Sequence, residues 1–141
     1  MHILFSINHP SQYHMFKHLA RKIIDSGGSV FFFIQDRGII EKLVKSDGLK
    51  YKFSTSPWLR TYFKGKYGIM LRCFLSIVQQ EINIFIYNIF HKVDFMLGCD
   101  VSIAHTGFIL RRKAYVFTDD DYVFTKQYCH LAYPFAKHIV A

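Results

Sequence analysis

The sequence predicts an α/β fold of the Rossmann-like type, a mostly parallel sheet with helices on both faces. Three observations predict this fold. Short apolar runs typical of strands alternate along the chain with longer segments of helical periodicity. The strand-like runs are apolar throughout, as expected of strands buried on both faces. A length of 141 residues suits one domain, so we expect residues 1–141 to form a single Rossmann-like domain.

Strands are expected where short apolar and aromatic runs lie between turn signals. We expect them at residues 3–7, 30–34, 51–53, 94–97, 114–117 and 138–140. The first helix is predicted over residues 15–26, because its apolar residues share one stripe and Gly27 and Gly28 then suit a left-handed helix end. Further helices are expected over residues 39–45, 69–92 and 122–130.

The segment 69–93 is the longest apolar stretch of the chain. Gln79, Gln80 and Glu81 interrupt it at its centre, so we expect it not to cross a membrane, which takes about 20 predominantly apolar residues in a row. Its polar positions leave a narrow exposed stripe, and the helix is therefore expected to be largely covered. Residues 54–68 form a long irregular connection, and such connections are often functional.

Composition limits the classes of function. Hydrophobic residues make up 51% of the chain and aromatic residues 18%, which excludes disordered, coiled-coil and collagen-like proteins. The net charge of +8 favours anionic partners, namely phosphates, nucleic acid or an anionic lipid surface. No RNA-binding or helix-turn-helix signature is present, so nucleic acid is not an expected partner.

The cysteines and the N-terminal residues favour a cytoplasmic protein. Cys73, Cys99 and Cys129 are odd in number and form no C-x-x-C motif, so neither a disulfide framework nor a structural zinc site is expected. This usage is typical of a reducing compartment. Residues 1–5 have no basic leader and no cleavage site, and they are expected to be a buried strand rather than a signal peptide.

The first candidate site lies between the first strand and the first helix and contains Asn8, His9, Pro10, Ser11 and His14. Ligands of open α/β sheets bind at the carboxyl ends of strands, where helix N-termini also offer free N–H groups. Asn8 can adopt a left-handed turn and Ser11 can cap the helix, so Asn8, Pro10 and Ser11 are candidate substrate-binding residues. His9 and His14 are candidate general bases, since histidine titrates near neutral pH. In the alternative interpretation these residues only shape the turn.

The same segment gives no indication of a cofactor or a metal. The phosphate-binding pattern G-x-G-x-x-G is absent, so no dinucleotide cofactor is expected. His14 and His18 are four residues apart and could share a metal ion, but no cysteine or carboxylate pattern accompanies them. Surface or partly buried histidines are the preferred interpretation, and no metal site is expected.

Two further candidate sites follow later strands. Asp119, Asp120 and Asp121 come directly after an apolar run and could hold a sugar hydroxyl, a ribose or a hydrated divalent ion. Alternatively they only begin a helix, whose dipole favours acidic residues in its first turn. His105 and Thr106 follow the fourth expected strand and are predicted to lie in a third loop on the same edge of the sheet.

Residues 60–67 interleave basic and aromatic side chains. This pattern suits phosphates or an anionic lipid surface, with the aromatic rings at the interface. We therefore expect a peripheral membrane contact through residues 58–72. A solvated basic surface is the alternative.

Several discrete motifs carry a resemblance that spans nearly the whole chain. Early motifs are His9-Pro10, His14 and Phe16-Lys17 after the first strand, and the Gly-Gly-Ser-Val turn before the second. Later motifs are residues 97–100 (LGCD), His105, residues 119–122 (DDDY) and residues 131–136 (LAYPFA). In these motifs the chain resembles the N-terminal half of the bacterial family called domain of unknown function 354. That family is similar to GT-B glycosyltransferases of the MurG type and to UDP-N-acetylglucosamine 2-epimerases.

The resemblance implies one half of a two-domain enzyme. In those relatives two Rossmann-like domains face each other across a cleft, the N-terminal one supplying acceptor and catalytic contacts and the C-terminal one holding the nucleotide. The chain is then expected to lack the C-terminal nucleotide-binding domain and to be inactive alone. Within that half, His9 or His14 would act as base or acceptor-positioning group, and Asp119, Asp120 and Asp121 would bind hydroxyls.

The implied function is the acceptor-side domain of a glycosyltransferase of surface polysaccharide biosynthesis. Its partners would be a nucleotide sugar and a saccharide or lipid-linked acceptor, at the inner face of the cytoplasmic membrane. Two alternatives stay open. One is a half-domain of a nucleotide-sugar 2-epimerase, and the other is a non-catalytic module that binds a saccharide or a partner protein.

Overall fold

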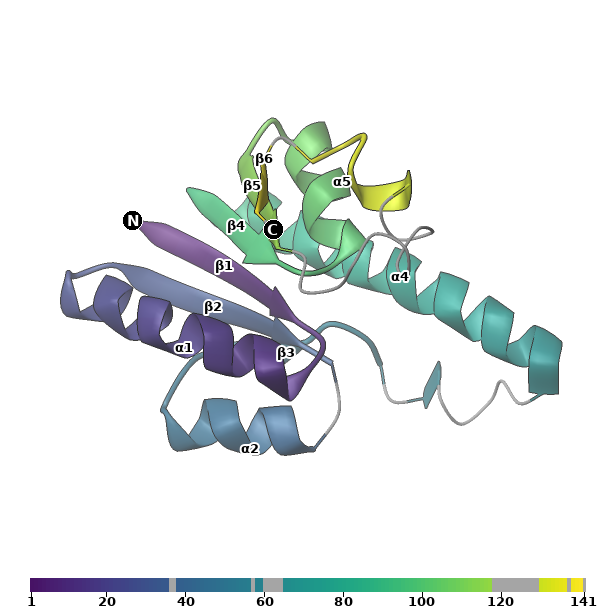
Figure 1. Ribbon diagram of the computed structural model, residues 1–141, viewed down its shortest axis with the longest axis horizontal. Helices are drawn as coiled ribbons and strands as arrows, with labels where there is room; N and C mark the ends of the chain where they lie inside the picture. Colours follow the sequence, from purple (N-terminus) through teal and green to yellow (C-terminus); the bar gives the residue numbers. More distant parts are fainter. Residues whose placement is uncertain (36–37, 57, 60–64, 118–129, 137, 141) are drawn as a thin grey trace.

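The computed structural model describes residues 1–35, 38–56, 58–59, 65–117, 130–136 and 138–140. These residues contain a six-stranded parallel sheet in the order β3-β2-β1-β4-β5-β6 (Figure 1). The strands are β1 (His2–Ile7), β2 (Ser29–Ile34), β3 (Tyr51–Phe53), β4 (Phe95–Gly98), β5 (Lys113–Phe117) and β6 (His138–Val140). The structure confirms each expected strand to within one residue at either end, and with them the Rossmann-like class.

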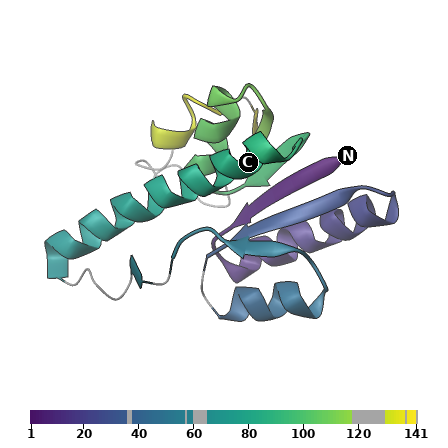
Figure 2. The ribbon, with the colours of Figure 1, turned by 180° about the vertical axis from the view of Figure 1, so that it is seen from behind.

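Helices cover both faces of the sheet. On one face lie α1 (Pro10–Asp25) and α2 (Ile39–Ser46), and on the other lie α4 (Gly65–Phe90) and α5 (Val101–Ile109) (Figure 1 and Figure 2). Successive residues of a strand point to opposite faces, so Ile3, Phe5 and Ile7 pack with α1 and α2. Leu4 of the same strand packs with α4 and α5. This burial on both faces explains why the strands are apolar throughout.

The first helix begins earlier than its apolar stripe predicts. α1 starts at Pro10, five residues before the expected position, because proline suits the first turn of a helix, where its missing N–H has no partner to lose. The helix ends before Gly27, whose φ of +81° is the left-handed conformation expected at a helix end. α2 agrees with its expected range to within one residue.

α5 corrects the expectation that His105 and Thr106 lie in a loop, since both residues are inside this helix. Asp100 caps it by accepting a hydrogen bond from the Ile103 N–H at 3.3 Å. Its buried residues occupy nearly every side of the helix: Val101, Ser102, Ile103, Ala104, Thr106 and Gly107. A helix buried all round carries no amphipathic stripe, and for this reason the sequence does not reveal it.

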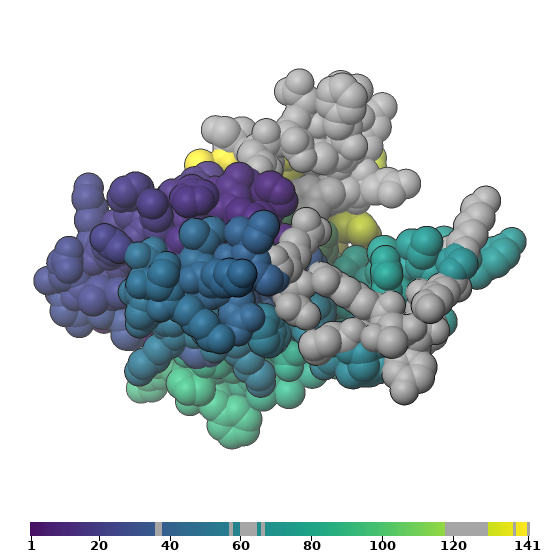
Figure 3. All heavy atoms as spheres, turned by 90° about the horizontal axis from the view of Figure 1, so that it is seen from below, coloured from purple at the N-terminus to yellow at the C-terminus, as the bar shows by residue number. Residues whose placement is uncertain are grey.

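α4 is far more exposed than expected. Gln80, Ile84 and Asn88, spaced one turn apart, form its buried face, and none of the side chains described between residues 65 and 79 is buried. The space-filling view shows the start of α4 standing clear of the part formed by residues 1–53 (Figure 3). Exposed apolar side chains run along the helix: Tyr67, Ile69, Met70, Leu71, Phe74, Ile77, Ile82, Ile86, Ile89 and Phe90. The expectation of a largely covered helix is therefore wrong for the described residues.

α4 is also long and apolar enough to cross a membrane. Tyr67–Phe90 meets the length and composition of a spanning helix, and 11% of its apolar window is buried within the fold. The expectation that the polar residues 79–81 exclude a spanning helix is thus wrong by these two criteria. In the structure, the face that contains Gln80, Ile84 and Asn88 is packed within the α/β fold.

Candidate functional site

The strand order creates a crevice at the carboxyl edge of the sheet, between β1 and β4. The chain proceeds from β1 to β2 and β3 on one side, and to β4 and β5 on the other. Connections that leave β1 and β4 therefore diverge, and ligands of open α/β sheets bind at this switch point. Ser6 pairs with Gly98 in the sheet, so Asn8 and Asp100 follow the two strands on either side of the crevice.

A buried hydrogen-bond network forms the base of this crevice. Oδ2 of Asp100 accepts bonds from Ser6 Oγ at 2.5 Å, from Gln80 Nε2 at 2.8 Å and from Asn8 Nδ2 at 3.4 Å. Nε2 of Gln80 also lies 3.1 Å from Ser6 Oγ. One carboxyl group thus joins β1, α4 and the start of α5. We call Ser6, Asn8, Gln80 and Asp100 the edge network.

Burial governs the chemistry of the Asp100 carboxyl. Loss of hydration raises the pKa of Asp100 above its usual range, and the donors Ser6 and Gln80 only partly oppose this effect. The group therefore serves as a buried hydrogen-bond centre that holds the edge in place. Oδ1 of Asn8, in the same network, is buried and has no partner within the described residues. Most buried polar atoms do have a hydrogen-bond partner, so this oxygen is an exception in the network.

His9 has a structural task at the start of α1. Its Nδ1 accepts a hydrogen bond from the Ser11 N–H at 3.3 Å. Oε1 of Gln12 in turn accepts bonds from the N–H groups of Asn8 at 2.8 Å and His9 at 3.2 Å, which completes a capping box. His9 and not Ser11 is therefore the cap. Asn8 is not left-handed, because Arg111 is the only non-glycine residue with a positive φ in the described part of the chain.

The cap determines which ring atom of His9 can meet a ligand. Because Nδ1 accepts a backbone hydrogen bond, the neutral ring carries its proton on Nε2. The ring is exposed at the end of β1. In this tautomer His9 can donate a hydrogen bond to a ligand, whereas proton abstraction would require Nδ1 to give up the cap.

The remaining residues of the first candidate site lie on α1. Pro10 and Ser11 are in its first turn, and His14 and His18 are exposed farther along it. The ring of His14 meets the ring of Tyr13 edge-on, with centroids 5.9 Å apart. Within the described residues, no group of three or more His, Cys, Asp or Glu side chains could hold a metal ion.

His105 and Thr106 connect elements of the fold. Nδ1 of His105 lies 2.6 Å from Oε1 of Glu81 on α4, and its Nε2 lies 2.9 Å from the carbonyl oxygen of Leu131. The ring therefore links α4, α5 and residues 130–136. Thr106 is buried in the core and both residues lie in α5, so the prediction that they form a loop is wrong, whereas their role in substrate binding stays a prediction.

Other predicted site residues lie outside the described residues. These are the acidic triplet Asp119, Asp120 and Asp121 and the central part of the basic segment, residues 60–64. Directly before residues 60–64, Trp58 is exposed and Leu59 is buried. The roles assigned to the triplet and to the basic segment stay predictions.

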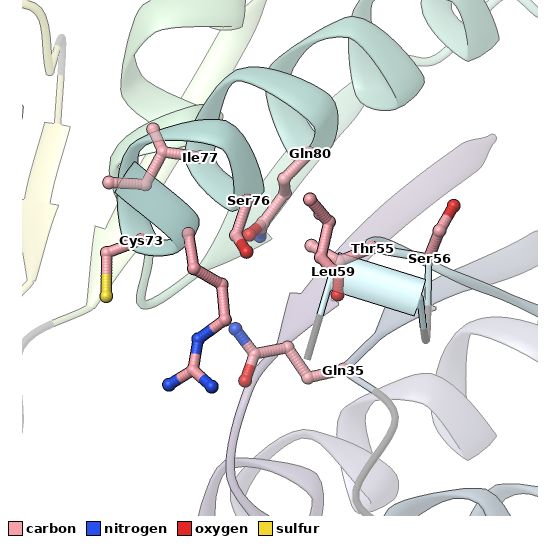
Figure 4. A pocket seen from close by; sticks show the side chains of 9 residues that line it. Gln35, Thr55, Ser56, Leu59, Cys73, Ser76, Ile77 and Gln80 are labelled. Carbon is pink, nitrogen blue, oxygen red and sulfur yellow. The ribbon is translucent and has the colours of Figure 1, made fainter. Parts of the chain in front are cut away.

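A cavity of about 350 Å³ adjoins the edge network (Figure 4). Gln35 after β2 and Thr55 and Ser56 after β3 form one side, and α4 forms the other from Arg72 to Gln80. Gln80 belongs to both the cavity and the edge network, so the two features share the carboxyl edge of the sheet. A volume of this size is typical of small-molecule sites, which span roughly 300–1,000 Å³.

Sequence reasoning missed Ser6, Gln80 and Asp100 as residues of this edge. The available signal was a polar residue at an apolar position: Ser6 within the first strand, Gln80 within the long helix and Asp100 directly after the fourth strand. A buried polar side chain needs a hydrogen-bond partner, but the sequence does not tell which one.

The parallel sheet and its helices place the chain in the Rossmann-like α/β class, with the fold found in GT-B glycosyltransferases. Two solved structures share this fold. MurG of Acinetobacter baumannii matches with a TM-score of 0.69 and 13% identity, over 98% of this chain and 40% of MurG. The glycotransferase of kitacinnamycin matches with a TM-score of 0.60 and 14% identity, over 92% of this chain and 33% of that protein.

These likenesses concern the fold, since the sequence identities are low. The chain spans 40% and 33% of the lengths of the two proteins. No protein-family model matches the sequence, and neither does any curated protein. The resemblance to domain of unknown function 354 and to the epimerases therefore stays a prediction.

Proposed function

We propose that this chain is the acceptor-side domain of a GT-B-like glycosyltransferase of surface polysaccharide biosynthesis. The observation that carries the proposal is the polar cavity at the carboxyl edge of a sheet whose fold is shared with MurG over 98% of the chain. The proposed substrates are a nucleotide sugar and a saccharide or lipid-linked acceptor. A second, nucleotide-binding domain is proposed to face this edge.

The proposed roles follow from the positions at the edge. His9 positions an acceptor hydroxyl through Nε2, because its Nδ1 is held by the helix cap. His14 is the candidate base, since its exposed ring makes no hydrogen bond within the described residues. The buried oxygen of Asn8 supports a role in binding a donor group of the substrate. Asp119, Asp120 and Asp121 are proposed to bind sugar hydroxyls.

Transfer of labelled sugar from UDP-sugars to saccharide or lipid-linked acceptors tests these roles in the full-length protein. His9→Asn keeps an N-cap oxygen while removing the imidazole, so it separates chemistry from helix capping. His14→Gln removes the base. We expect the loss of a general base to lower kcat by about 10²–10⁴-fold. His18→Gln, an exposed histidine one turn along α1, is the matched control and should leave kcat unchanged.

The outcomes separate the proposal from its alternatives. Equal transfer by His9→Asn, His14→Gln and the parent protein would contradict both histidine roles. Conversion of UDP-sugar without any acceptor would identify an epimerase, since transfer needs an acceptor. Saccharide binding without turnover in either assay would identify a non-catalytic binding module.

We further propose that this domain acts in the cytoplasm, in peripheral contact with the inner membrane face through residues 58–72. The exposed Trp58, Ile69 and Met70 support this contact, as does the net charge of +8, which favours anionic lipid. Phe74 extends the apolar surface by one further turn of α4.

Flotation with vesicles of phosphatidylcholine, with and without phosphatidylglycerol, tests the contact. We expect binding to the anionic vesicles, and a loss of about tenfold or more in Met70→Ser/Phe74→Ser, since each buried large apolar side chain contributes about 1.5–3 kcal/mol. Ile39→Ser, on the opposite face of the sheet, is the control for loss of an exposed apolar residue. Equal binding by all three proteins would refute the contact.

A further inference from the structure

The cavity beside the edge network has a chemical character of its own. Its walls come from the ends of β2 and β3 and from one side of α4, and Figure 4 shows Gln35 and Ser76 on opposite sides of it. Leu59, Cys73 and Ile77 supply the apolar part of the lining. Among the described residues, the polar part consists of one cation and several neutral side chains. No Asp or Glu side chain lines the cavity within the described residues.

The cation is Arg72, which is partly buried in the cavity wall. Within the described residues its guanidinium forms no ion pair. The basic side chains of Arg21 and Lys45 are exposed and are nevertheless paired, with Asp47 at 2.6 Å and with Glu41 at 2.7 Å. An uncompensated guanidinium in a concave wall favours an anionic occupant, because desolvation strengthens its attraction for opposite charge.

Neutral donors surround this guanidinium. The hydroxyls of Thr55 and Ser76 and the side-chain amide of Gln35 line the cavity and make no hydrogen bond within the described residues. Ser56 is held in place by Gln79, whose Oε1 accepts from the Ser56 N–H at 2.9 Å and whose Nε2 donates to the Ser56 hydroxyl at 2.6 Å. These two bonds connect the segment after β3 to α4 beside the cavity.

The edge network fixes the inner end of the cavity. Gln80 uses its amide nitrogen for Asp100 and Ser6, which holds its position on α4 relative to β1. Arg72 and Ser76 lie two turns and one turn before Gln80, on the same side of the helix. Their positions are thus set by a buried contact and not by a surface loop.

We infer that this cavity is a phosphate-binding subsite, with Arg72 as the charged ligand and Ser76, Thr55 and Gln35 as neutral donors. Arginine forms strong charge-assisted bonds with phosphate oxygens, and hydroxyl and amide donors can complete the coordination. The subsite deepens the proposed function and rests on it for the origin of the phosphate. Both a nucleotide sugar and a lipid-linked acceptor carry a diphosphate, and the chemistry that the cavity recognises is the same in either molecule.

Calorimetric titration of the full chain with inorganic diphosphate tests the subsite directly. We expect binding by the parent protein and a loss of about tenfold or more in Arg72→Gln, which removes a charge-assisted hydrogen-bond donor. Arg112→Gln is the matched control, because Arg112 precedes β5 and lies at the opposite edge of the sheet with the same charge. It should bind within about twofold of the parent protein, since non-specific attraction alone changes little on loss of one distant charge.

A second arm distinguishes a soluble from a lipid phosphate. Vesicles of phosphatidylcholine with phosphatidic acid are compared with phosphatidylcholine alone, again for the parent protein, Arg72→Gln and Arg112→Gln. If diphosphate binding depends on Arg72, the subsite is assigned to the phosphate of a soluble substrate. Dependence on Arg72 with the phosphatidic acid vesicles alone assigns it to a lipid headgroup.

Ser76→Ala guards against loss of the fold in Arg72→Gln. It removes one neutral donor from a partly buried position on α4, and we expect a loss of about threefold or more in diphosphate affinity, in line with one neutral hydrogen bond. Equal affinity of the parent protein, folded Arg72→Gln and Ser76→Ala in both arms overturns the inference, and so does an equal loss in Arg112→Gln. If the subsite inference fails but the protein still transfers sugar, the proposed function stands. If diphosphate binding depends on Arg72 but the protein neither transfers sugar nor epimerises it, the proposed function is refuted and the subsite stands.

Discussion

Nε2 of Gln80 lies 2.8 Å from Oδ2 of Asp100, so the long helix α4 and the start of α5 share a buried hydrogen bond at the carboxyl edge of the sheet. The same nitrogen lies 3.1 Å from Ser6 Oγ on β1. Elements that are far apart in the sequence are thereby joined beside the cavity.

A double-mutant cycle with Gln80→Ala and Asp100→Asn measures the first hydrogen bond. Gln80→Ala is expected to lower the free energy of unfolding by about 1.5–3 kcal/mol, because it removes a donor to a buried carboxyl. The coupling energy between the two substitutions should be about 0.5–3 kcal/mol. Urea unfolding at pH 7 provides the four free energies.

Asn83→Ala is the control for this cycle. Asn83 lies on the same helix and donates to the Ser54 carbonyl oxygen at 2.9 Å, without contact to Asp100. Its coupling to Asp100→Asn should be close to zero, since the two residues share no partner. A coupling as large as that of Gln80 would show that the cycle reports a general loosening of α4.

The buried carboxyl of Asp100 should make the stability of the protein depend on pH. Burial raises the pKa of Asp100, so the folded protein binds its proton more tightly than the unfolded chain does. Stability from this group is therefore full below about pH 4, the ordinary pKa of aspartate, and is lost as the pH rises through the folded-state pKa. Asp100→Asn cannot ionise, so its stability relative to the parent protein should improve between pH 4 and pH 8. Urea unfolding across this range measures the difference, and a difference independent of pH would contradict the shift.

The bond between Tyr13 and Asp47 should give the opposite pH dependence of stability. The Tyr13 hydroxyl donates to Asp47, and this bond, together with Arg21, lowers the pKa of the Asp47 carboxyl. Tyr13→Phe should lower the free energy of unfolding at pH 7 by about 1.5–3 kcal/mol, the usual contribution of a hydrogen bond to a charged group. The contribution of a depressed pKa is present above the unfolded pKa of about 4 and is lost as the pH falls through the folded value.

The difference between Tyr13→Phe and the parent protein should therefore shrink as the pH falls from 6 to 2. Thermal unfolding at both ends of this range measures it. Tyr115→Phe is the control, because the Tyr115 hydroxyl makes no hydrogen bond within the described residues and its ring stacks on His138. If both substitutions destabilise the protein equally, the effect comes from the loss of any tyrosine hydroxyl and not from the bond between Tyr13 and Asp47.

Gly98 predicts a steric effect at the crevice. A Cβ at this position would lie 2.8 Å from the Ser6 carbonyl oxygen and 2.9 Å from Cγ1 of Ile103. Gly98→Ala should therefore cost about 3 kcal/mol, because the backbone of β1 has to move. At Gly48, with a φ of +65° and open space around it, Gly48→Ala should cost about 1 kcal/mol from backbone strain alone. Chemical denaturation of the two variants gives the comparison, and an equal cost would argue against tight packing at Gly98.

Much of the fold could be predicted from local patterns. The strand runs and the amphipathic stripe of α1 are visible in the sequence because each reflects which faces of one element are buried. α5 could not be predicted in this way, since it is buried nearly all round. The exposure of α4 could not be predicted either. An apolar helix has the same composition whether a neighbour covers it or the helix extends beyond the sheet, as its first turns do here.

The candidate site also has a part that local sequence patterns predict and a part that they do not. The place of the loop with His9 and Pro10, at the end of the first strand, follows from the sequence, because helix and strand signals meet there. The sequence does not predict that the His9 ring caps the helix, and it does not predict the bonds between Ser6, Gln80 and Asp100.

The sequence by itself determined the Rossmann-like class and the strand positions, and it predicts that a ligand binds at the carboxyl edge of the sheet. The tertiary structure alone decided which polar residues meet at that edge. Ser6 and Asp100 are 94 residues apart, and Gln80 reaches both from a helix on one face of the sheet. Periodicity reports the environment of one element, whereas a contact between elements depends on the strand order and on how each helix lies across the sheet. The cavity with Arg72 exists for that reason.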